Sequence, residues 1–458
     1  MKNKTFFRYF RTFQGILLFS VCSICFGQQA RVAEEAPPDG SLRESQVILQ
    51  KVSELTGMPV RYPVKEGQKT VEEVTAYIMA EFKDAYPGDT LEKKEKIFKA
   101  FRLIPDEMDL EQFLIALYTE QTGAFYDPDT KAYYTVDREF GALENRMIQA
   151  HELTHALQDQ NFNLMRFNRI TIDNDDYDLA KAAVIEGEAT MAMIEYLLQD
   201  MGVEDTGFID WGFLLEQIPN MTFNDPNMEI FNRAPEFIKN SLLFPYVKGA
   251  SFISALLKSG WDWEKLGSLF SDMPLTTEQI LHPEKYYLQR DFPAMILFPP
   301  PARMAGPDWN LLEDNIMGEY GVYLFLKENG ISHKVAIAGS AGWDGDRYFG
   351  FEATTTGHIY LIWLSVWDSE KDAREFFVSL ANIIGRWSGT TIDAEKRADA
   401  GIVSVAAENG DQYLLEKKQD SVLFLAAPKD MLPSLSRTAW KSKRRETVET
   451  AFNPAKNE

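Results

Sequence analysis

The spacing of apolar residues divides the chain into a mostly helical first part and a mixed second part. From about Gln46 to Gln121, segments such as SQVILQKVSELTG repeat apolar residues every three or four positions, the period of a helix with one buried face. The same period returns between Glu144 and about Leu281. Between these stretches, GAFY and AYYTV consist of strand-forming residues and flank the turn sequence Asp-Pro-Asp-Thr-Lys, which predicts a β-hairpin.

A proline cluster, FPPPARMAGPDW at residues 298–309, marks the expected boundary between two domains. Beyond it, YFGFEATTTGHIYLIWLSVWD predicts two strands, SEKDAREFFVSLANIIGRW a helix, and GIVSVAAENGDQYLLEKKQDSVLFLAAP further strands; a basic helix is expected through Lys441–Arg445. The predicted class is therefore α+β. A mostly helical domain with a small β-hairpin or sheet spans 46–300, and a smaller α+β domain of unknown role spans 301–458.

The first residues have the layout of a secretory signal. Four basic residues precede an apolar run at residues 15–26, which is short for a membrane span. We predict a signal peptide at 1–27 and a flexible, proline-containing leader at 28–45, with an uncleaved anchor as the alternative. The protein is then exported to the periplasm or secreted, and its mature chain is not expected to insert into a membrane. Both cysteines, Cys22 and Cys25, fall within the signal, so disulfides and thiolate chemistry are not expected.

The composition and net charge limit which classes of binding partner are expected. The chain has 45% hydrophobic and 25% charged residues, as globular proteins do, and a formal net charge of −22. This negative charge repels polyanions, so nucleic acid and anionic membrane surfaces are not expected partners.

The stretch AHELTHALQDQ, residues 150–160, carries the chemistry. On a helix, His151 and His155 project from one face and can both bind one zinc ion. Glu152 is turned about 100° from His151 around the helix, where it can take a proton from water. The alternative is a surface helix with two solvated histidines.

A zinc hydrolase needs a third protein ligand, and no further histidine lies near this motif. On the helix expected at Leu179–Asp200, Glu186 shares its face with apolar residues, and a carboxylate there needs a compensating charge. Glu188 points almost the opposite way, so we expect it to be solvated or salt-bridged. The alternatives are a supporting role behind a ligand and, in place of Glu186, the role of third ligand. One Zn²⁺ per chain, held by His151, His155 and Glu186, is the prediction.

HELTH followed by Glu-Gly-Glu-Ala resembles the gluzincin class of zinc metallopeptidases, which includes thermolysin-like and aminopeptidase N-like enzymes. Matching Glu-Gly-x-Ala to the latter family makes Glu186 the third ligand. The segment FPYVKGA is similar to that family's Tyr-x-Lys-Gly-Ala element, whose tyrosine stabilises the oxyanion, and this assigns the role to Tyr246. The resemblance covers about 123–287, implies a zincin-like catalytic domain there, and does not reach the C-terminal domain.

Two features depart from the aminopeptidase N-like pattern. The 30 residues between His155 and Glu186 exceed that family's spacing. In addition, GAFYD stands where that family has Gly-x-Met-Glu-Asn, so Tyr126 replaces the glutamate that holds the substrate's free amine. These departures favour an endopeptidase that pairs an extended peptide with this strand over an aminopeptidase.

His282, in TTEQILHPEKYY, is a candidate second oxyanion donor, as a histidine is in thermolysin-like enzymes, or else a structural loop residue. His333 and His358 have no metal-spaced partners and are expected to be ordinary. The sequence therefore predicts an exported zinc peptidase acting on peptides or proteins, with Glu152 and Tyr246 as catalytic residues. The alternatives are an inactive or scaffolding zinc-binding protein and a zinc hydrolase of another bond.

Overall fold

The computed structural model describes residues 44–446 apart from 139, 168–172, 204–208, 210, 212–213, 216–227, 302–303, 305 and 408–409. The predicted signal peptide lies outside these residues. So does the predicted leader, except for residues 44 and 45, which begin the first described helix. None of the described helices combines the length and the apolarity that crossing a membrane requires.

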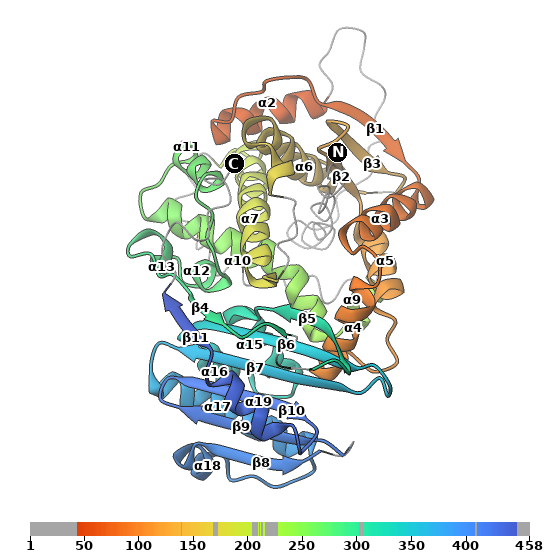
Figure 1. Ribbon diagram of the computed structural model, residues 1–458. Coiled ribbons are helices and arrows are strands. Elements are labelled where there is room, and N and C mark those ends of the chain that lie inside the picture. Colours follow the sequence, from red (N-terminus) through yellow and green to blue (C-terminus); the bar gives the residue numbers. More distant parts are fainter. Residues whose placement is uncertain are drawn as a thin grey trace, which may run out of the picture.

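Helices dominate the first part of the chain, and α6, α7 and α10 lie at its centre (Figure 1). The described helices before residue 290 are α2 (Glu44–Thr56), α3 (Val71–Ala85), α4 (Thr90–Ala100), α5 (Leu110–Gln121), α6 (Ala142–Phe162), α7 (Asp175–Asp200), α9 (Glu229–Arg233), α10 (Glu236–Lys258), α11 (Trp263–Leu266), α12 (Thr277–Leu281) and α13 (Glu284–Tyr287).

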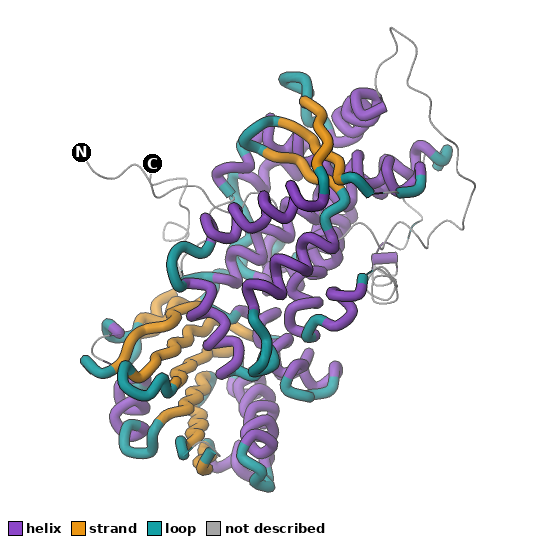
Figure 2. Tube along the Cα trace, turned by 90° about the vertical axis from the view of Figure 1, so that its right-hand side faces the viewer, coloured by secondary structure: helices purple, strands orange, loops and turns teal. Residues whose placement is uncertain are grey.

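The predicted hairpin forms and becomes part of a three-stranded sheet. Strands β2 (Ala124–Asp127) and β3 (Ala132–Val136) are antiparallel, and β1 (Lys65–Lys69) joins β3 in parallel, which gives the order β1-β3-β2. Strand β2 is therefore an edge strand, and its neighbour on the other side is helix α6. Figure 2 shows this small sheet and the large C-terminal sheet at opposite ends of the molecule, with helices between them.

The second part is built on a six-stranded antiparallel sheet of order β5-β6-β7-β10-β9-β8. Its strands are β5 (Trp309–Asn315), β6 (Trp343–Ala353), β7 (Ile359–Trp367), β8 (Ile402–Ala406), β9 (Gln412–Lys418) and β10 (Ser421–Ala427). The accompanying helices are α15 (Gly318–Glu328), α16 (His333–Ser340), α17 (Glu370–Trp387), α18 (Ala394–Ala400) and α19 (Leu432–Ala439). Helices and a sheet segregated in this way confirm the coarse α+β class.

Strand β7 explains why this sheet has apolar residues on both faces. Leu361 and Trp363 point into a core that includes Phe376 and Leu380 of α17. The alternate residues, such as Ile362, join a second core that includes helix α19. A strand covered on both faces reads as a continuous apolar run, as IYLIWLSVW does.

The expected basic helix at Lys441–Arg445 is wrong. Residues Lys443–Glu446 form strand β11, which pairs antiparallel with β4 (Ala294–Leu297). Arg444 contacts the carboxylates of Asp344 and Asp420, so its charge is balanced by acidic residues of the second part. The pairing is a tertiary contact, which the local run of basic residues does not encode.

One of the apolar cores contains residues from both parts of the chain, so the two parts are packed together and not joined by a linker alone. Ile97 and Phe101, at the end of α4, belong to the core beneath the six-stranded sheet. The Phe101 ring lies 5.3 Å from that of Tyr348 and 5.8 Å from that of Trp363, in both cases edge to face. Favourable aromatic packing of this kind fixes the helical part against the sheet.

The start of α7 is also held from the second part. The Lys94 ammonium, which is mostly buried, lies 2.5 Å from Asp175 Oδ2 and 2.8 Å from Glu313 Oε1. The backbone N–H of Asp175 donates to Asn315 Oδ1 at 2.9 Å. Contacts with β5 thus set the position of the helix that carries Glu186.

The next residue of α7 makes a second buried junction. Asp176 Oδ1 accepts hydrogen bonds from the Thr277 backbone N–H at 3.1 Å and from the Thr277 hydroxyl at 2.5 Å. A Cβ added to Gly318 would lie 1.8 Å from the same oxygen, and Gly318 has φ +73°, so only glycine fits there. Burial raises the pKa of the Asp176 carboxyl to about 8, although the bonds from Thr277 oppose the shift.

We predict that Asp176→Asn reduces the pH dependence of stability. Because the pKa of Asp176 is raised on folding, its contribution is fully present below its unfolded pKa of about 4 and is lost as pH rises through 8. Asparagine keeps the acceptor oxygen but does not ionise, so the variant should lose less stability than wild type between pH 6 and 9. Asp176→Ala should cost about 1–3 kcal/mol throughout, because Thr277 loses its acceptor. Urea unfolding at both pH values checks this, and equal pH dependence in wild type and Asp176→Asn would contradict it.

Candidate metal centre

Helix α6 carries the histidine motif through the interior of the first part. Its first turn is closed by Glu144, whose Oε2 accepts the Gly141 N–H at 2.7 Å, and it ends at Asn163 in the left-handed conformation. Residues 150–160 are all buried. The alternative of a surface helix with solvated histidines is wrong, since His151 and His155 have no exposed surface.

Three side chains from α6 and α7 converge on one point. His151 Nε2 lies 3.0 Å from His155 Nε2 and 3.2 Å from Glu186 Oε2, and His155 Nε2 lies 3.4 Å from the same carboxylate oxygen. The structure thus brings together the three residues predicted as metal ligands. Glu186 is 3% exposed, so its negative charge has little access to bulk water.

The triangle of atoms fits a zinc ion. Tetrahedral ligands about 2.0–2.1 Å from zinc lie about 3.3–3.4 Å from one another, close to the 3.0–3.4 Å separations here. Two imidazoles and one carboxylate are a donor set of catalytic zinc sites. Burial alone would lower the pKa of His155, but the charge and hydrogen bond of Glu186 raise it to about 9, so the site favours a positive charge.

A second acidic cluster does not need a metal ion. Glu278, Asp291 and Asp368 also lie close together. The Lys285 ammonium sits among them, at 2.6 Å, 2.9 Å and 3.0 Å from their respective carboxylates. The lysine already supplies the compensating positive charge.

The two oxygens of the Glu152 carboxylate differ in their contacts. Its Oε2 accepts the backbone N–H of Tyr126 on β2 at 2.8 Å. Its Oε1 is buried and has no hydrogen-bond partner among the described residues. Burial raises the pKa of the carboxyl to about 8; the charge of Glu186 adds to this, and His155 and the Tyr126 N–H oppose it. A carboxylate with a raised pKa and an unsatisfied oxygen is suited to accept a proton.

The edge of β2 faces this carboxylate. The Val136 N–H donates to the Gly123 carbonyl across the hairpin, whereas the Tyr126 N–H points to Glu152. Because backbone groups alternate along a strand, those of Ala124 and Tyr126 lie on the side away from β3.

No carboxylate of the GAFYD segment is left for a substrate amine. The Tyr126 hydroxyl donates to Asp159 Oδ2 at 2.8 Å, and Lys131 lies 2.6 Å from the same oxygen. Asp127 accepts the Asp129 N–H and the Thr130 hydroxyl within the turn. Each polar side chain of this strand is engaged inside the protein.

Two glycines explain how α7 and α10 come together beside the histidines. A Cβ on Gly187 would lie 2.3 Å from the Gly249 backbone, and one on Gly249 would lie 2.1 Å from the Ala183 carbonyl oxygen. Backbone contact at this point requires glycine on both helices. The crossing brings Tyr246 of α10 to His151, with ring centroids 6.0 Å apart and planes inclined by 27°.

The expectation that Glu188 is solvated or salt-bridged is wrong. Glu188 is 2% exposed, and its Oε2 accepts a hydrogen bond from Gln158 Nε2 at 2.7 Å. Gln158 also contacts His155 Nδ1, so Glu188 lies behind a predicted ligand, as one alternative held, and Glu186 is the carboxylate at the histidine Nε2 atoms. Helix α7 is buried on opposite faces at this point. The Glu188 side chain therefore points away from Glu186 without reaching solvent. The sequence marks Gln158 only by its position three residues after His155, on the same helical face.

The other histidines lie elsewhere. His282 Nε2 is 3.0 Å from Glu319 Oε1 of α15, so the structure pairs it with the second part rather than with the triad. Its predicted role as a second oxyanion donor therefore has no geometric support. His333 contacts the Tyr323 hydroxyl, and His358 contacts Asp411.

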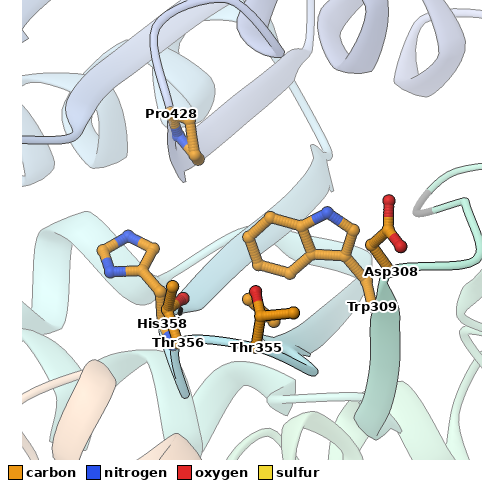
Figure 3. Close-up of a pocket in the computed structure, with 7 residues that line it drawn as sticks. Asp308, Trp309, Thr355, Thr356, His358 and Pro428 are labelled. Carbon is orange, nitrogen blue, oxygen red and sulfur yellow. Dashed lines mark hydrogen bonds between the residues drawn. The ribbon is translucent and has the colours of Figure 1, made fainter.

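A separate cleft of about 450 Å³ lies at one end of the six-stranded sheet. Figure 3 shows Trp309 between Pro428 and Thr355, with His358 across from it. The lining residues are Asp308, Trp309, Ala353, Thr355, Thr356, His358 and Pro428, and none belongs to the triad. Its described lining residues include no lysine or arginine.

Comparison with known proteins reaches only the second part of the chain. Residues 310–435 match a family described as a domain of unknown function (DUF8575). The match covers most of the six-stranded sheet with its helices. It begins well after α6 and α7, which lie outside it. No curated protein and no solved structure matches the chain.

We predict that Gly187→Ala and Gly249→Ala each lower the free energy of unfolding by about 1–3 kcal/mol, because the added methyl meets backbone that cannot rotate away. Gly321→Ala in α15 is the matched control. Its new methyl would lie 3.0 Å from the flexible Met317 side chain, and alanine favours the helix. Urea unfolding of the three variants checks the prediction, which is wrong if all three are equally stable.

Proposed function

We propose that this protein is a zinc-dependent peptidase of the gluzincin type, and an endopeptidase rather than an aminopeptidase. The observation that carries the proposal is the convergence of His151, His155 and Glu186 beside a buried Glu152 oxygen that none of the described residues engages. Zinc bound by these three residues would polarise a peptide carbonyl and lower the pKa of a water molecule. A purely structural site has no use for a base beside it.

The protein's own residues supply the proton transfers. Glu152 is held by the Tyr126 N–H through one oxygen and takes the proton of the attacking water with the other. It then passes this proton to the leaving amine. Tyr246, stacked near His151, would donate a hydrogen bond to the oxyanion that forms from the carbonyl.

The edge strand supports an endopeptidase. The backbone groups of Ala124 and the carbonyl of Tyr126 lie on the side of β2 away from β3, where an extended peptide can add as a further strand; the Tyr126 N–H on that side is already bonded to Glu152. The polar side chains of this strand are engaged internally, so it offers no carboxylate to anchor a free amino terminus. Because His151 and Glu152 are fully buried, a peptide must displace the groups that cover them.

We further propose that the enzyme is exported, given the signal-like pattern of residues 1–27.

The first test compares Glu152→Gln with wild type on a mixed peptide library. Glutamine keeps the acceptor for the Tyr126 N–H but cannot take a proton, so we expect unchanged zinc content and cleavage reduced at least about 100-fold. Glu186→Gln should instead lose zinc. Zinc content is measured by atomic spectrometry and cleavage by mass spectrometry. Wild type that holds zinc but cuts no peptide would favour a scaffold or a hydrolase of another bond, and wild type without zinc would refute the proposal.

The second test is Tyr246→Phe, which removes only the hydroxyl. If this hydroxyl stabilises the oxyanion, kcat should fall about 10²–10³-fold while KM and zinc content stay near wild type. An unchanged kcat would show that Tyr246 serves packing alone.

A further inference from the structure

Gln158 is a fully buried amide whose oxygen and nitrogen are both engaged. It lies on α6, three residues after His155, and its Oε1 is 2.7 Å from His155 Nδ1. Its Nε2 is 3.0 Å from the Ile185 carbonyl oxygen and 2.7 Å from Glu188 Oε2.

These partners fix which way the amide faces. The Ile185 backbone carbonyl oxygen can only accept a hydrogen bond, so the NH₂ group of Gln158 must face Ile185 and, beside it, Glu188. The amide oxygen is thereby directed at His155. That oxygen can only accept, so Nδ1 of His155 carries the proton and donates it.

The tautomer of His155 follows. With the proton on Nδ1, the neutral ring has its lone pair on Nε2, the atom that lies 3.0 Å from His151 Nε2 and 3.4 Å from Glu186 Oε2. This is the nitrogen that a metal ion in the triad requires. The hydrogen bond also sets the orientation of the ring in its plane.

We infer that Gln158 and Glu188 are positioning residues for the metal centre: Glu188 orients the Gln158 amide, and Gln158 fixes the metal-binding tautomer of His155. The inference rests on the proposed function of the triad as a zinc site. The two glutamates of Glu-Gly-Glu-Ala then act on opposite sides of the same imidazole, Glu186 at the metal-binding nitrogen and Glu188 behind the other one.

The arrangement also links the two helices of the site. Gln158 belongs to α6, whereas Ile185 and Glu188 flank Glu186 on α7. A shift of α7 that moved Glu186 would therefore also disturb the partner of His155. Gln158 thus orients His155 and, through its contacts with α7, helps to keep Glu186 in place.

The experiment measures zinc affinity by competition with a chromophoric chelator. Gln158→Leu removes the acceptor for His155, so we expect zinc to bind about 10–100-fold more weakly and to be released faster. Gln160→Leu is the matched control. Gln160 is buried on the same helix and bonds the backbone of Arg61 and Tyr62, so its loss should lower stability but leave zinc affinity unchanged.

An exchange of the two side chains separates positioning from packing. Gln158→Glu alone places two carboxylates together, and Glu188→Gln alone leaves the Gln158 amide without its charged acceptor, so each should weaken zinc binding. In the double variant the carboxylate accepts from His155 and the amide at 188 donates to it, but the Ile185 carbonyl loses its donor, so part of the lost affinity should return.

The outcomes distinguish the inference from the proposal on which it rests. Wild type that binds no zinc refutes the proposed function. Wild type that binds zinc and cleaves peptides, together with a Gln158→Leu variant of equal zinc affinity, refutes the inference alone. Equal losses in Gln158→Leu and Gln160→Leu, or a double variant no better than the single ones, would also overturn it.

Discussion

The structure is organised around a carboxylate kept out of water between two imidazoles. Removing a charge such as that of Glu186 from water costs several kcal/mol unless an opposite charge accompanies it. His151 and His155 approach its oxygen to 3.2 Å and 3.4 Å, but two neutral rings do not cancel that charge. A proton on His155 or a metal ion does, which is why the donor set and its burial together support the proposed zinc site.

The rest of the helical part serves to hold these groups in place. Glycine is a poor helix former, at about 1 kcal/mol below alanine, yet α7 and α10 each have one where their backbones touch. At the start of α7, contacts from Lys94 and Thr277 fix the first turn of the helix against the second part. The position of Glu186 is thus determined at both the middle and the start of its helix.

The sequence predicted those features that depend on local periodicity. The histidine pair and Glu186 follow from helical spacing, and the hairpin from its turn residues. Glu188 was misjudged because a helical wheel separates two faces but does not say whether both are buried. The strand at Lys443–Glu446 and the pairing of His282 with Glu319 depend on segments distant in the chain, which local patterns do not report. Gln158 is uncharged and common in helices, so nothing in its residue type marked it.

Strand β11 has a consequence for the order of assembly. It is the last described strand, and its partner β4 lies about 150 residues earlier, at the join between the two parts. During synthesis, β4 has no strand partner among the described residues until residues 443–446 have left the ribosome. The six-stranded sheet can form before that moment, but the join between the two parts is completed only after β11 has been synthesised.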